Sequence, residues 1–423
     1  MTTDTTEKRA VLVIATLDTK SAEVMHLKAL IEGEGLECVI LDTGILGEPQ
    51  GVTPDIPASE TALAGGMPLA EVRKKPSRGA AVEVMLEGAR VFTRRLFEAG
   101  RIHGAISMGG AEGGVMAAAA MQVLPPGFPK VIITPLASGH RPFEPFIGIR
   151  DILVMHSLVD IAGINDISRA VFDNAGHAIC GMVRHYRPLE ITRRNLVAVT
   201  TLGTTEWAMR RISQGLRAAG FEPIIFHSSG VGGRVMEDMI GRGFFCGVVD
   251  LCPNELTDHL VGGFHDAGPG RLEAAGRMGI PQAVSTGCMD FFAQGGKETI
   301  PEKWRGRKMY YHNPAFTLIR PSHEEMRRLG ELMADKLNRA RGPVRVVLPL
   351  GGMSIGGKKG GSTYDPEGDR ALFETLKAKL NREIPVVELA CHVNDEPFAD
   401  RLVAEFLAIA AAAPPAGPPA GKG

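Results

Sequence analysis

The chain has 423 residues, a length that suggests two or three domains. Its 47 Lys and Arg residues balance 48 Asp and Glu residues, and this balance excludes a broad basic face for nucleic-acid backbones, though not a small local patch. Hydrophobic residues make up 44% and charged residues 22%, which excludes disorder over most of the chain, while glycine is in excess at 52 residues.

The sequence carries no signs of export or of membrane insertion. The first residues lack an apolar signal core, and no apolar stretch approaches the ~20 residues that a membrane helix needs. The six cysteines form no CxxC pair and therefore predict free thiols in a reducing compartment. We expect a cytoplasmic protein that binds neither a membrane nor a nucleic acid.

Short apolar runs alternate with helical patterns along the first half of the chain. Residues 11–15 (VLVIA) predict a buried strand, residues 21–34 carry apolar side chains at helical spacing, and residues 37–41 predict the next strand. This order is typical of βαβ units with parallel strands and right-handed crossovers. Further strands are expected at 103–108, 130–134 and 178–183.

A long polar stretch, residues 47–77, follows the second predicted strand and is rich in proline and glycine. A loop of this length is either a lid or binding flap, or a surface insertion. The sequence leaves both interpretations open.

The pattern of the first half restarts near residue 196. Five residues recur 185 positions later without a gap: Thr16, Leu17, Thr19, Gly35 and Ile40 return as Thr201, Leu202, Thr204, Gly220 and Ile225. This match predicts a duplicated domain, although any two first βα units resemble each other to some degree. Strands of the second half are expected at 222–226, 246–251, 281–285, 308–311, 344–349 and 385–389.

We therefore predict an α/β protein of two tandem Rossmann-like, doubly wound domains with mainly parallel sheets. The first domain is expected to span residues 1–190 and the second residues 191–410. Residues 411–423, rich in proline and alanine, have nothing to bury and predict a disordered tail.

Candidate binding residues follow the strands, because ligands of open α/β sheets bind beyond the carboxyl ends of the strands. Residues 16–20 open a helix and suit a phosphate, although Asp18 and Thr19 also fit simple helix capping. Asp42 lies where an acidic residue often binds a ribose hydroxyl.

A glycine-rich loop, residues 109–114, follows the third predicted strand and precedes a helical pattern. Its four glycines allow the backbone either to approach a ligand closely or to pack tightly between helix and sheet. Residues 134 and 138–140 follow the next strand on the same edge. The predicted ligand-binding residues of the first domain are Thr16, Leu17, Asp18, Thr19, Lys20, Asp42, Thr43, Gly44, Gly109, Gly110, Ala111, Glu112, Gly113, Gly114 and Thr134.

The matching loops of the second half lack the charged groups of the first. Gly203, Thr205 and His227 stand where the first half has an aspartate, a lysine and an aspartate, so the same ligand is not expected there. Hydroxyls, glycines and an arginine suit a small carboxylate or phosphate at an interdomain cleft. The second-site candidates are Thr201, Thr204, Thr205, Ser228, Gly230, Gly232, Gly233, Arg234, Ser285 and Gly287.

Standard catalytic and nucleotide signatures are missing from the sequence. Ala111 breaks a GxGxxG pattern in the loop at 109–114, and Lys359 replaces the Ser or Thr of a P-loop in the segment that begins at Gly352. No zinc spacing and no GxSxG elbow is present. His392 and Asp395 suit an acid/base pair or, more simply, a histidine satisfied by local hydrogen bonds. The sequence thus predicts no metal site and assigns no catalytic residue.

Seven motifs together resemble the Tm-1-like family, which is named after a plant tobamovirus-resistance protein. They are VIATLDTK, SMGGAEGG, HSLVDIAGIN, TTLGTTE, STGCMDFF, LPLGGMS and HVNDEPFAD, and the resemblance runs from about residue 10 to about residue 407. It implies two tandem Rossmann-like domains, ATP in the N-terminal domain, and self-association as a dimer. Carried onto this sequence, the resemblance places ATP on residues 16–20, 42–44 and 109–114.

Two hypotheses of function follow. In the first, the chain is an ATP-binding enzyme that acts on a small anionic metabolite, by phosphoryl transfer or ligation. In the second, it is a non-enzymatic, ATP-regulated module that binds protein partners. The expected cofactor is ATP, with or without Mg²⁺; another nucleotide or phosphate metabolite is a third, weaker interpretation.

Overall fold

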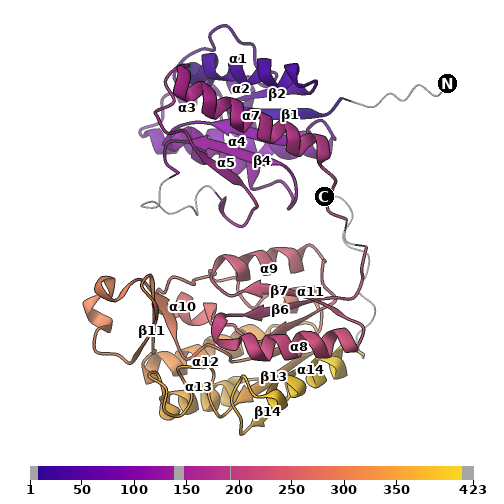
Figure 1. Cartoon of the computed structure of the whole chain (residues 1–423), viewed down its shortest axis with the longest axis vertical. Helices are drawn as coiled ribbons and strands as arrows, with labels where there is room; N and C mark the ends of the chain where they lie inside the picture. The colour runs from indigo at the N-terminus through magenta and orange to yellow at the C-terminus, as the bar shows by residue number, and fades with distance from the viewer. Residues whose placement is uncertain (1–7, 138–146, 191, 412–423) are drawn as a thin grey trace, which may run out of the picture. The chain divides into compact units, whose positions relative to one another are not determined.

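The computed structural model describes residues 8–137, 147–190 and 192–411. These residues form two compact units, which we call unit 1 (residues 8–190) and unit 2 (residues 192–411) (Figure 1). Two sequence predictions, the tail at 412–423 and the candidates at 138–140, lie outside the described residues.

Unit 1 is built on a five-stranded parallel sheet with the strand order β2-β1-β3-β4-β5. The strands are β1 (Ala10–Ala15), β2 (Glu37–Asp42), β3 (Gly104–Met108), β4 (Lys130–Thr134) and β5 (Leu153–His156). The chain passes from β1 to β2 on one side of β1 and then from β2 to β3 on the other side. The topological switch point therefore lies between β1 and β3.

Helices cover both faces of this sheet, which explains why its central strands are apolar on both sides. Val11 and Val13 of β1 share one core with α1 (Leu17–Gly33) and α7 (Asp166–His185). Leu12 and Ile14 point to the other face and share a second core with α4 (Arg78–Glu98) and α5 (Ala111–Met121). Because successive side chains of β1 point to opposite faces of the sheet, this strand packs against both helical layers.

Two predictions for unit 1 need correction. Residues 178–183 are not a strand but the last part of α7, whose apolar side chains recur at helical spacing and whose start carries a capping box between Asn165 and Ser168. The fifth strand is instead β5, an edge strand with a half-exposed pattern that gives no apolar run. The stretch at 47–77 is not an extended loop, because it contains α2 (Ala58–Ala64) and α3 (Leu69–Val72).

Unit 2 is built on a six-stranded parallel sheet with the order β14-β13-β9-β8-β6-β7. The strands are β6 (Leu196–Thr201), β7 (Glu222–His227), β8 (Gly247–Asp250), β9 (Gln282–Ser285), β13 (Val344–Pro349) and β14 (Val386–Leu389). Its first five strands repeat the order found in unit 1. Since that order is common among doubly wound sheets, the duplication stays a prediction.

The helices of unit 2 also cover both faces of its sheet. One face carries α8 (Glu206–Ala218), which follows the short η1 (Gly203–Thr205), and α14 (Glu396–Ala410). The other face carries α9 (Val231–Gly241), α10 (Glu255–Val261), α11 (Ala274–Met278), α12 (His323–Asn338) and α13 (Pro366–Lys379).

A small antiparallel sheet, with the order β10-β12-β11, is inserted in unit 2. Its strands are β10 (Phe292–Gln294), β11 (Met309–Asn313) and β12 (Phe316–Ile319), with the short η2 (Lys297–Thr299) and η3 (Glu302–Trp304) between the first two. The strand expected at 308–311 is β11 and belongs to this insertion.

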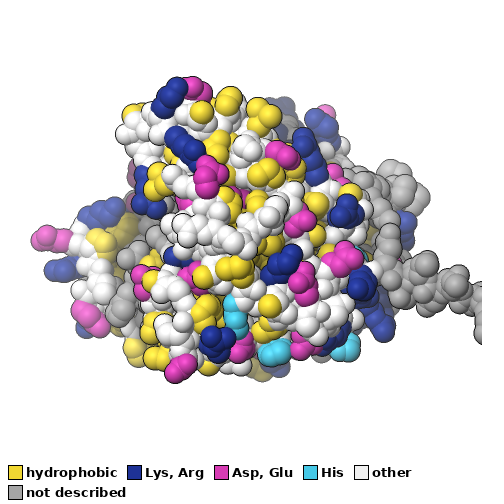
Figure 2. Space-filling view, turned by 90° about the horizontal axis from the view of Figure 1, so that it is seen from above, with side chains coloured by type: hydrophobic (Ala, Val, Ile, Leu, Met, Phe, Trp, Pro, Cys, Tyr) yellow, Lys and Arg dark blue, Asp and Glu magenta, His cyan; other side chains and the backbone are white. Residues whose placement is uncertain are grey.

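The predicted fold class is confirmed: the protein is α/β, with two tandem Rossmann-like units on mainly parallel sheets. Among the described helices, none combines the length and the apolar composition that spanning a bilayer requires. On the face drawn in Figure 2, Lys and Arg side chains are interspersed with Asp and Glu side chains and do not merge into one basic surface.

Candidate functional site

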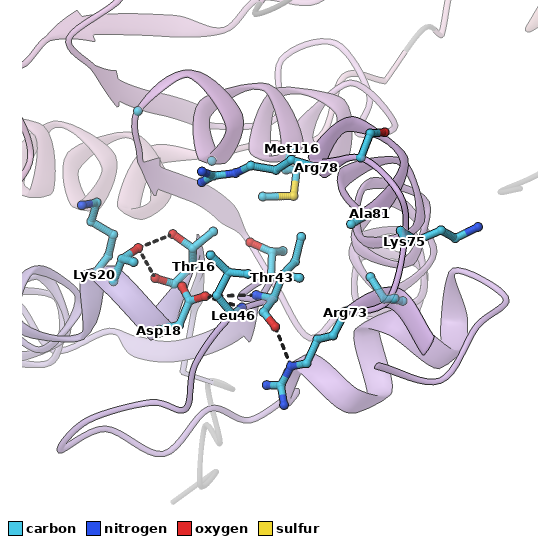
Figure 3. A pocket seen from close by; sticks show the side chains of 16 residues that line it. Thr16, Asp18, Lys20, Thr43, Leu46, Arg73, Lys75, Arg78, Ala81 and Met116 are labelled. Atoms are coloured by element: carbon cyan, nitrogen blue, oxygen red, sulfur yellow. Dashed lines mark hydrogen bonds between the residues drawn. The ribbon is translucent and has the colours of Figure 1, made fainter. Parts of the chain in front are cut away.

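A cavity of about 550 Å³ lies beyond the carboxyl ends of the unit 1 strands, at the switch point between β1 and β3 (Figure 3). Thr16 and Asp18 follow β1, Thr43 follows β2, and Gly110 and Gly113 follow β3. The volume falls within the range of about 300–1,000 Å³ that is typical of small-molecule sites. We call this cavity the switch-point cavity.

Three helices begin at the wall of the switch-point cavity. Thr16, Ser77 and Gly110, the residues that directly precede α1, α4 and α5, all line it. The first amides of a helix have no acceptor within the helix, and the helix dipole makes this end partly positive. The start of α5 is the most open of the three, because Gly110 provides no capping side chain. In contrast, Ser77 Oγ accepts from the Ala80 amide of α4, and Asp42 Oδ1 accepts from the Leu17 amide of α1. Such a convergence favours an anion.

The charged side chains of the wall have the same preference. Four basic residues line the cavity, Lys20, Arg73, Lys75 and Arg78, against one acidic residue, Asp18, among the described residues. In Figure 3 the Arg78 side chain points into the cavity and that of Lys75 points away from it. The described wall therefore carries a net positive charge that complements a phosphate group.

Arg73 holds the wall that follows β2. Its Nε donates a hydrogen bond to the Ile45 carbonyl at 2.6 Å, and its Nη2 donates to the Gly47 carbonyl at 3.2 Å. Arg73 lies in the stretch between β2 and α4, so this stretch both lines the cavity and fixes its neighbouring loop.

Two aspartates tie the same loop to the start of α1. Asp18 Oδ2 accepts hydrogen bonds from the Ile45 and Leu46 amides at 3.1 and 2.9 Å. Asp42 Oδ1 accepts from the Leu17 and Gly44 amides at 3.0 and 2.8 Å. Asp42 is buried, and this burial raises the pKa of its carboxyl group. Its role is to position the loops, since it does not line the cavity.

The glycines of the loop at 109–114 serve two different purposes. A Cβ on Gly109 would lie 2.9 Å from the backbone of Gly113, so Gly109 is needed for close packing. A Cβ on Gly110 would meet nothing within 4 Å, and one on Gly113 would lie 3.9 Å from Thr16. These two glycines keep the cavity open beside the start of α5. The packing interpretation is thus confirmed for Gly109, while close approach to a ligand at Gly110 and Gly113 stays a prediction.

The structure brings seven of the predicted residues together in the switch-point cavity: Thr16, Asp18, Thr19, Lys20, Thr43, Gly110 and Gly113. Others lie outside its wall, namely Leu17, Asp42, Gly44, Gly109, Gly114 and Thr134. The side chains of Ala111 and Glu112 are outside the described set. Sequence reasoning missed Ile45, Leu46, Val72, Arg73, Lys75, Ser77, Arg78, Ala81 and Met116. The one available signal was the basic run at 73–78 in an otherwise polar insertion.

Unit 2 has a smaller cavity, about 250 Å³, at the carboxyl ends of β6 and β7. We call it the histidine pocket because His227, His265 and His312 line it. Its other lining residues are Leu202, Gly203, Thr204, Ser229, Phe291, Asn313, Phe316 and Leu318. Of the ten second-site candidates, only Thr204 lies in its wall.

The glycine loop before α9 binds a carboxylate of the protein itself. Glu255 Oε1 accepts hydrogen bonds from the Gly230 and Gly233 amides at 2.7 and 3.0 Å. A Cβ on Gly233 would lie 2.0 Å from Glu255 Oε2, and one on Gly232 would lie 1.8 Å from the His227 carbonyl oxygen. The anion predicted at this loop is therefore replaced by Glu255, and the glycines allow close packing.

The remaining second-site candidates do not gather around one ligand. Arg234 lines a separate surface hollow together with Glu237 and Asp238. A Cβ on Gly287 would lie 2.3 Å from the Leu251 carbonyl oxygen, which indicates packing. The others are buried in the unit: Thr201, Thr205, Ser228 and Ser285.

The His392 and Asp395 side chains do not form an acid/base pair. His392 Nε2 lies 2.9 Å from the Ser354 carbonyl oxygen, while Asp395 Oδ2 accepts from the His392 backbone amide at 2.7 Å. Local hydrogen bonds thus account for this histidine. In the parts of the chain that the structure describes, no group of three His, Cys, Asp or Glu side chains is placed to hold a metal ion.

The carboxyl group of Asp258, which accepts a hydrogen bond from the backbone of the pocket residue His265, should make the free energy of unfolding depend on pH. Its buried Oδ1 accepts from the His265 and Ala293 amides at 2.9 and 3.0 Å, and burial raises its pKa to about 8. Between about pH 4 and pH 8 the folded state keeps a proton that the unfolded state has lost, so this group lowers stability as pH rises through that window. Asp258→Asn, which resembles the protonated form, should remove this contribution.

Urea unfolding at pH 5 and pH 8.5 measures the effect. The wild-type chain should lose at least about 1 kcal/mol more stability between these pH values than the variant, the equivalent of one pKa unit. Parallel pH profiles for the two chains would contradict the assignment.

Comparison with known proteins agrees with the two-unit division. The model of the N-terminal domain of an uncharacterised protein family (UPF0261) matches residues 9–188, and the model of its C-terminal domain matches residues 194–410. A solved structure, UDP-N-acetylglucosamine 2-epimerase from Rickettsia bellii, aligns over 96% of both chains with 8% identity and a TM-score of 0.22, which is too low to carry an argument.

Similar sequences come from bacteria and from a plant. A UPF0261 protein of Clostridium tetani is 40% identical over 392 residues, which cover 92% of this chain and 96% of the relative. One from Rhizobium meliloti is 35% identical over 405 residues, covering 95% and 99%. The ToMV resistance protein Tm-1(GCR237) of Solanum lycopersicum is 36% identical over 339 residues, covering 78% of this chain and 45% of that protein. The chain belongs to the UPF0261 family and is homologous to the tomato Tm-1 protein, as its motifs predict.

Proposed function

We propose that unit 1 binds ATP in the switch-point cavity. The observation that carries this proposal is the convergence of three helix N-termini, at Thr16, Ser77 and Gly110, in one cavity whose wall is mainly basic. Phosphate groups are the ligands for which helix N-termini at a switch point are best suited. The family resemblance also implies ATP in the N-terminal domain, on loops that partly line this cavity, and the negative charge of ATP suits its basic wall.

The polar and apolar parts of the wall suggest an orientation for the nucleotide. The phosphates would lie beside Gly110, Gly113 and Arg78, where the open start of α5 meets a guanidinium group. The base would lie against the apolar side chains of the wall, which are Ile45, Leu46, Val72, Ala81 and Met116. Thr43, the lining residue next to the buried Asp42, is the proposed partner of the ribose.

We propose that Mg²⁺ accompanies the phosphates in this cavity. Mg²⁺ in nucleotide sites is commonly held by one or two carboxylates together with phosphate oxygens. Asp18 is the one carboxylate among the described lining residues, and its Oδ2 already accepts two amide hydrogen bonds. Asp18 Oδ1 is therefore the atom that we propose for contact with Mg²⁺, which would supply charge neutralisation at the phosphates.

The described wall favours ATP as a regulatory ligand over ATP as a consumed substrate. It contains no histidine or glutamate, and its one aspartate, Asp18, is the residue that we assign to Mg²⁺, so no other described side chain of the wall is suited to act as a general base. This supports the second hypothesis from the sequence, a module that binds partners under control of ATP. The tomato relative is named for virus resistance, and we do not extend that role to this chain.

Arg78 and Lys75 provide a matched test of the cavity. Arg78→Ala should weaken ATP binding about tenfold to a hundredfold, since a hydrogen bond to a charged group contributes about 1.5–3 kcal/mol. Lys75→Ala removes the same charge from a side chain that points away and should change the affinity by about threefold or less.

The stabilisation of the chain by ATP measures the binding. At 100 times the dissociation constant, ATP should stabilise the wild-type chain by about 2.7 kcal/mol, with little ADP formed. Equal losses in the two variants, or no stabilisation of the wild-type chain, would contradict the proposed site; rapid ADP release would contradict the regulatory role alone.

A further inference from the structure

The histidine pocket differs in chemistry from the switch-point cavity. Among the described residues its wall contains no Lys, Arg, Asp or Glu. Its polar side chains are three imidazoles, two hydroxyls and one amide, and its apolar ones are Leu202, Phe291, Phe316 and Leu318. A polyphosphate would find no fixed positive charge in this wall, and the volume of about 250 Å³ suits a molecule smaller than a nucleotide.

A chain of two hydrogen bonds, the first buried and the second partly buried, fixes the proton on His265. The Cys252 thiol donates to Asn254 Oδ1 at 3.5 Å, and this orients the amide so that Asn254 Nδ2 donates to His265 Nδ1 at 3.4 Å. Cys252 and Asn254 are both fully buried. Since Nδ1 accepts, a neutral His265 carries its proton on Nε2.

The surroundings keep both ends of this chain neutral. Burial, with smaller contributions from His227 and His312, lowers the pKa of His265 to about 4. Burial likewise raises the pKa of the Cys252 thiol, which remains protonated and able to donate. At neutral pH His265 is therefore a fixed hydrogen-bond donor through Nε2, at the wall of a cavity.

Aromatic and aliphatic side chains form the apolar part of the enclosure. The His265 and Phe316 rings lie 6.2 Å apart, centre to centre, at a tilt of 49°. Leu202, Phe291 and Leu318 belong to one buried apolar cluster at the inner end. Aromatic and aliphatic walls of this kind favour the faces of a planar ligand.

We propose that the histidine pocket is a second ligand site, which takes a small planar molecule that is uncharged at neutral pH and whose carbonyl or amide oxygen accepts a hydrogen bond from His265 Nε2. Phe316 contacts the face of the ligand, and His227 and His312 supply further hydrogen bonds at the rim. This site goes beyond ATP binding, and it replaces the small anion that the sequence predicts for the second domain.

Nicotinamide and benzamide are suitable probes, with nicotinate and benzoate as charged counterparts of the same shape. Calorimetry or ligand-observed NMR on the full chain at pH 7.5 should show that the two amides bind. Each carboxylate should bind at least about tenfold more weakly than the amide of the same shape, because no cation of the described wall pairs with its charge. The proposal is overturned if neither amide binds up to its solubility limit, or if the carboxylates bind as well as the amides.

His265→Phe keeps a ring of similar shape and removes the donor. The amides should bind this variant about tenfold more weakly, the equivalent of one hydrogen bond of about 1.4 kcal/mol. Phe316→Ala should weaken both amides as well. Unchanged amide affinity in a folded His265→Phe chain would overturn the role of His265. ATP binding should stay at the wild-type level in both variants, so failure here is distinguishable from failure of the switch-point cavity.

Discussion

Gly110→Asp is expected to reduce ATP binding by about a hundredfold or more. The new side chain fits, because a Cβ on Gly110 meets nothing within 4 Å and the residue has an ordinary φ of -67°. It places a carboxylate at the start of α5, in the position proposed for the phosphates. A carboxylate placed next to the negatively charged phosphates costs several kcal/mol of binding free energy, and each 1.4 kcal/mol is a factor of about ten in affinity.

Gly110→Ala is the control for this variant, because it adds the same Cβ without the charge. Its ATP affinity should fall about tenfold less than that of the Gly110→Asp chain, because only a methyl group, and no charge, enters the cavity. Aspartate caps a helix better than glycine, so the Gly110→Asp chain should be at least as stable as the wild-type chain. Calorimetric titration with ATP, alongside thermal unfolding, separates the two effects. Wild-type affinity in the Gly110→Asp chain would remove the switch-point cavity from consideration.

Arg271→Met is expected to destabilise unit 2 by about 3–5 kcal/mol. Arg271 is fully buried and pairs with two buried carboxylates: its Nη1 lies 2.5 Å from Asp250 Oδ2, and its Nε lies 2.6 Å from Glu255 Oε2. Glu237 lies 3.5 Å from the same guanidinium group. Removing the only cation that these carboxylates contact in the described network leaves them buried and uncompensated.

Arg277→Met is the matched control, since Arg277 pairs with Glu273 at 2.8 Å on a surface where its side chain is 60% exposed. Loss of an exposed pair should cost about 1 kcal/mol or less. Urea unfolding of the three chains gives the comparison. Similar small losses in both variants would show that the Arg271 network does not stabilise the unit.

The sequence predicts the fold where local pattern and tertiary packing agree. Buried strands such as β1 and the first four residues of β6 appear as continuous apolar runs, because helices cover both faces of each sheet. The two misread segments lack this agreement. β5 is a half-exposed edge strand of four residues, and residues 178–183 are a short apolar run within α7 that periodicity cannot distinguish from a strand.

The switch-point rule predicts part of the candidate site and misses the rest for a physical reason. Thr16 and Gly110 directly follow neighbouring strands of the sheet, so chain order alone places them together. Ser77 and Arg78 reach the same cavity because α2 and α3 pack and lead the chain back to the start of α4, which no local pattern shows.

Glycine clusters are ambiguous in the same way. The loops at 109–114 and 230–233 look alike in sequence, yet one opens a cavity and the other packs against a carboxylate. The difference depends on Glu255, which lies 25 residues beyond Gly230 and reaches back to its amide. A pattern confined to the loop cannot reveal such a partner.

Amide hydrogen exchange of the full chain, with and without saturating ATP, tests the central claim most directly. The account predicts slower exchange in peptides that contain the starts of α1, α4 and α5, around Thr16, Ser77 and Gly110. Exchange in unit 2, including the loop at 230–233 that Glu255 already occupies, should not change. Protection in unit 2 alone, or no protection anywhere, would contradict the proposal that unit 1 binds ATP in the switch-point cavity.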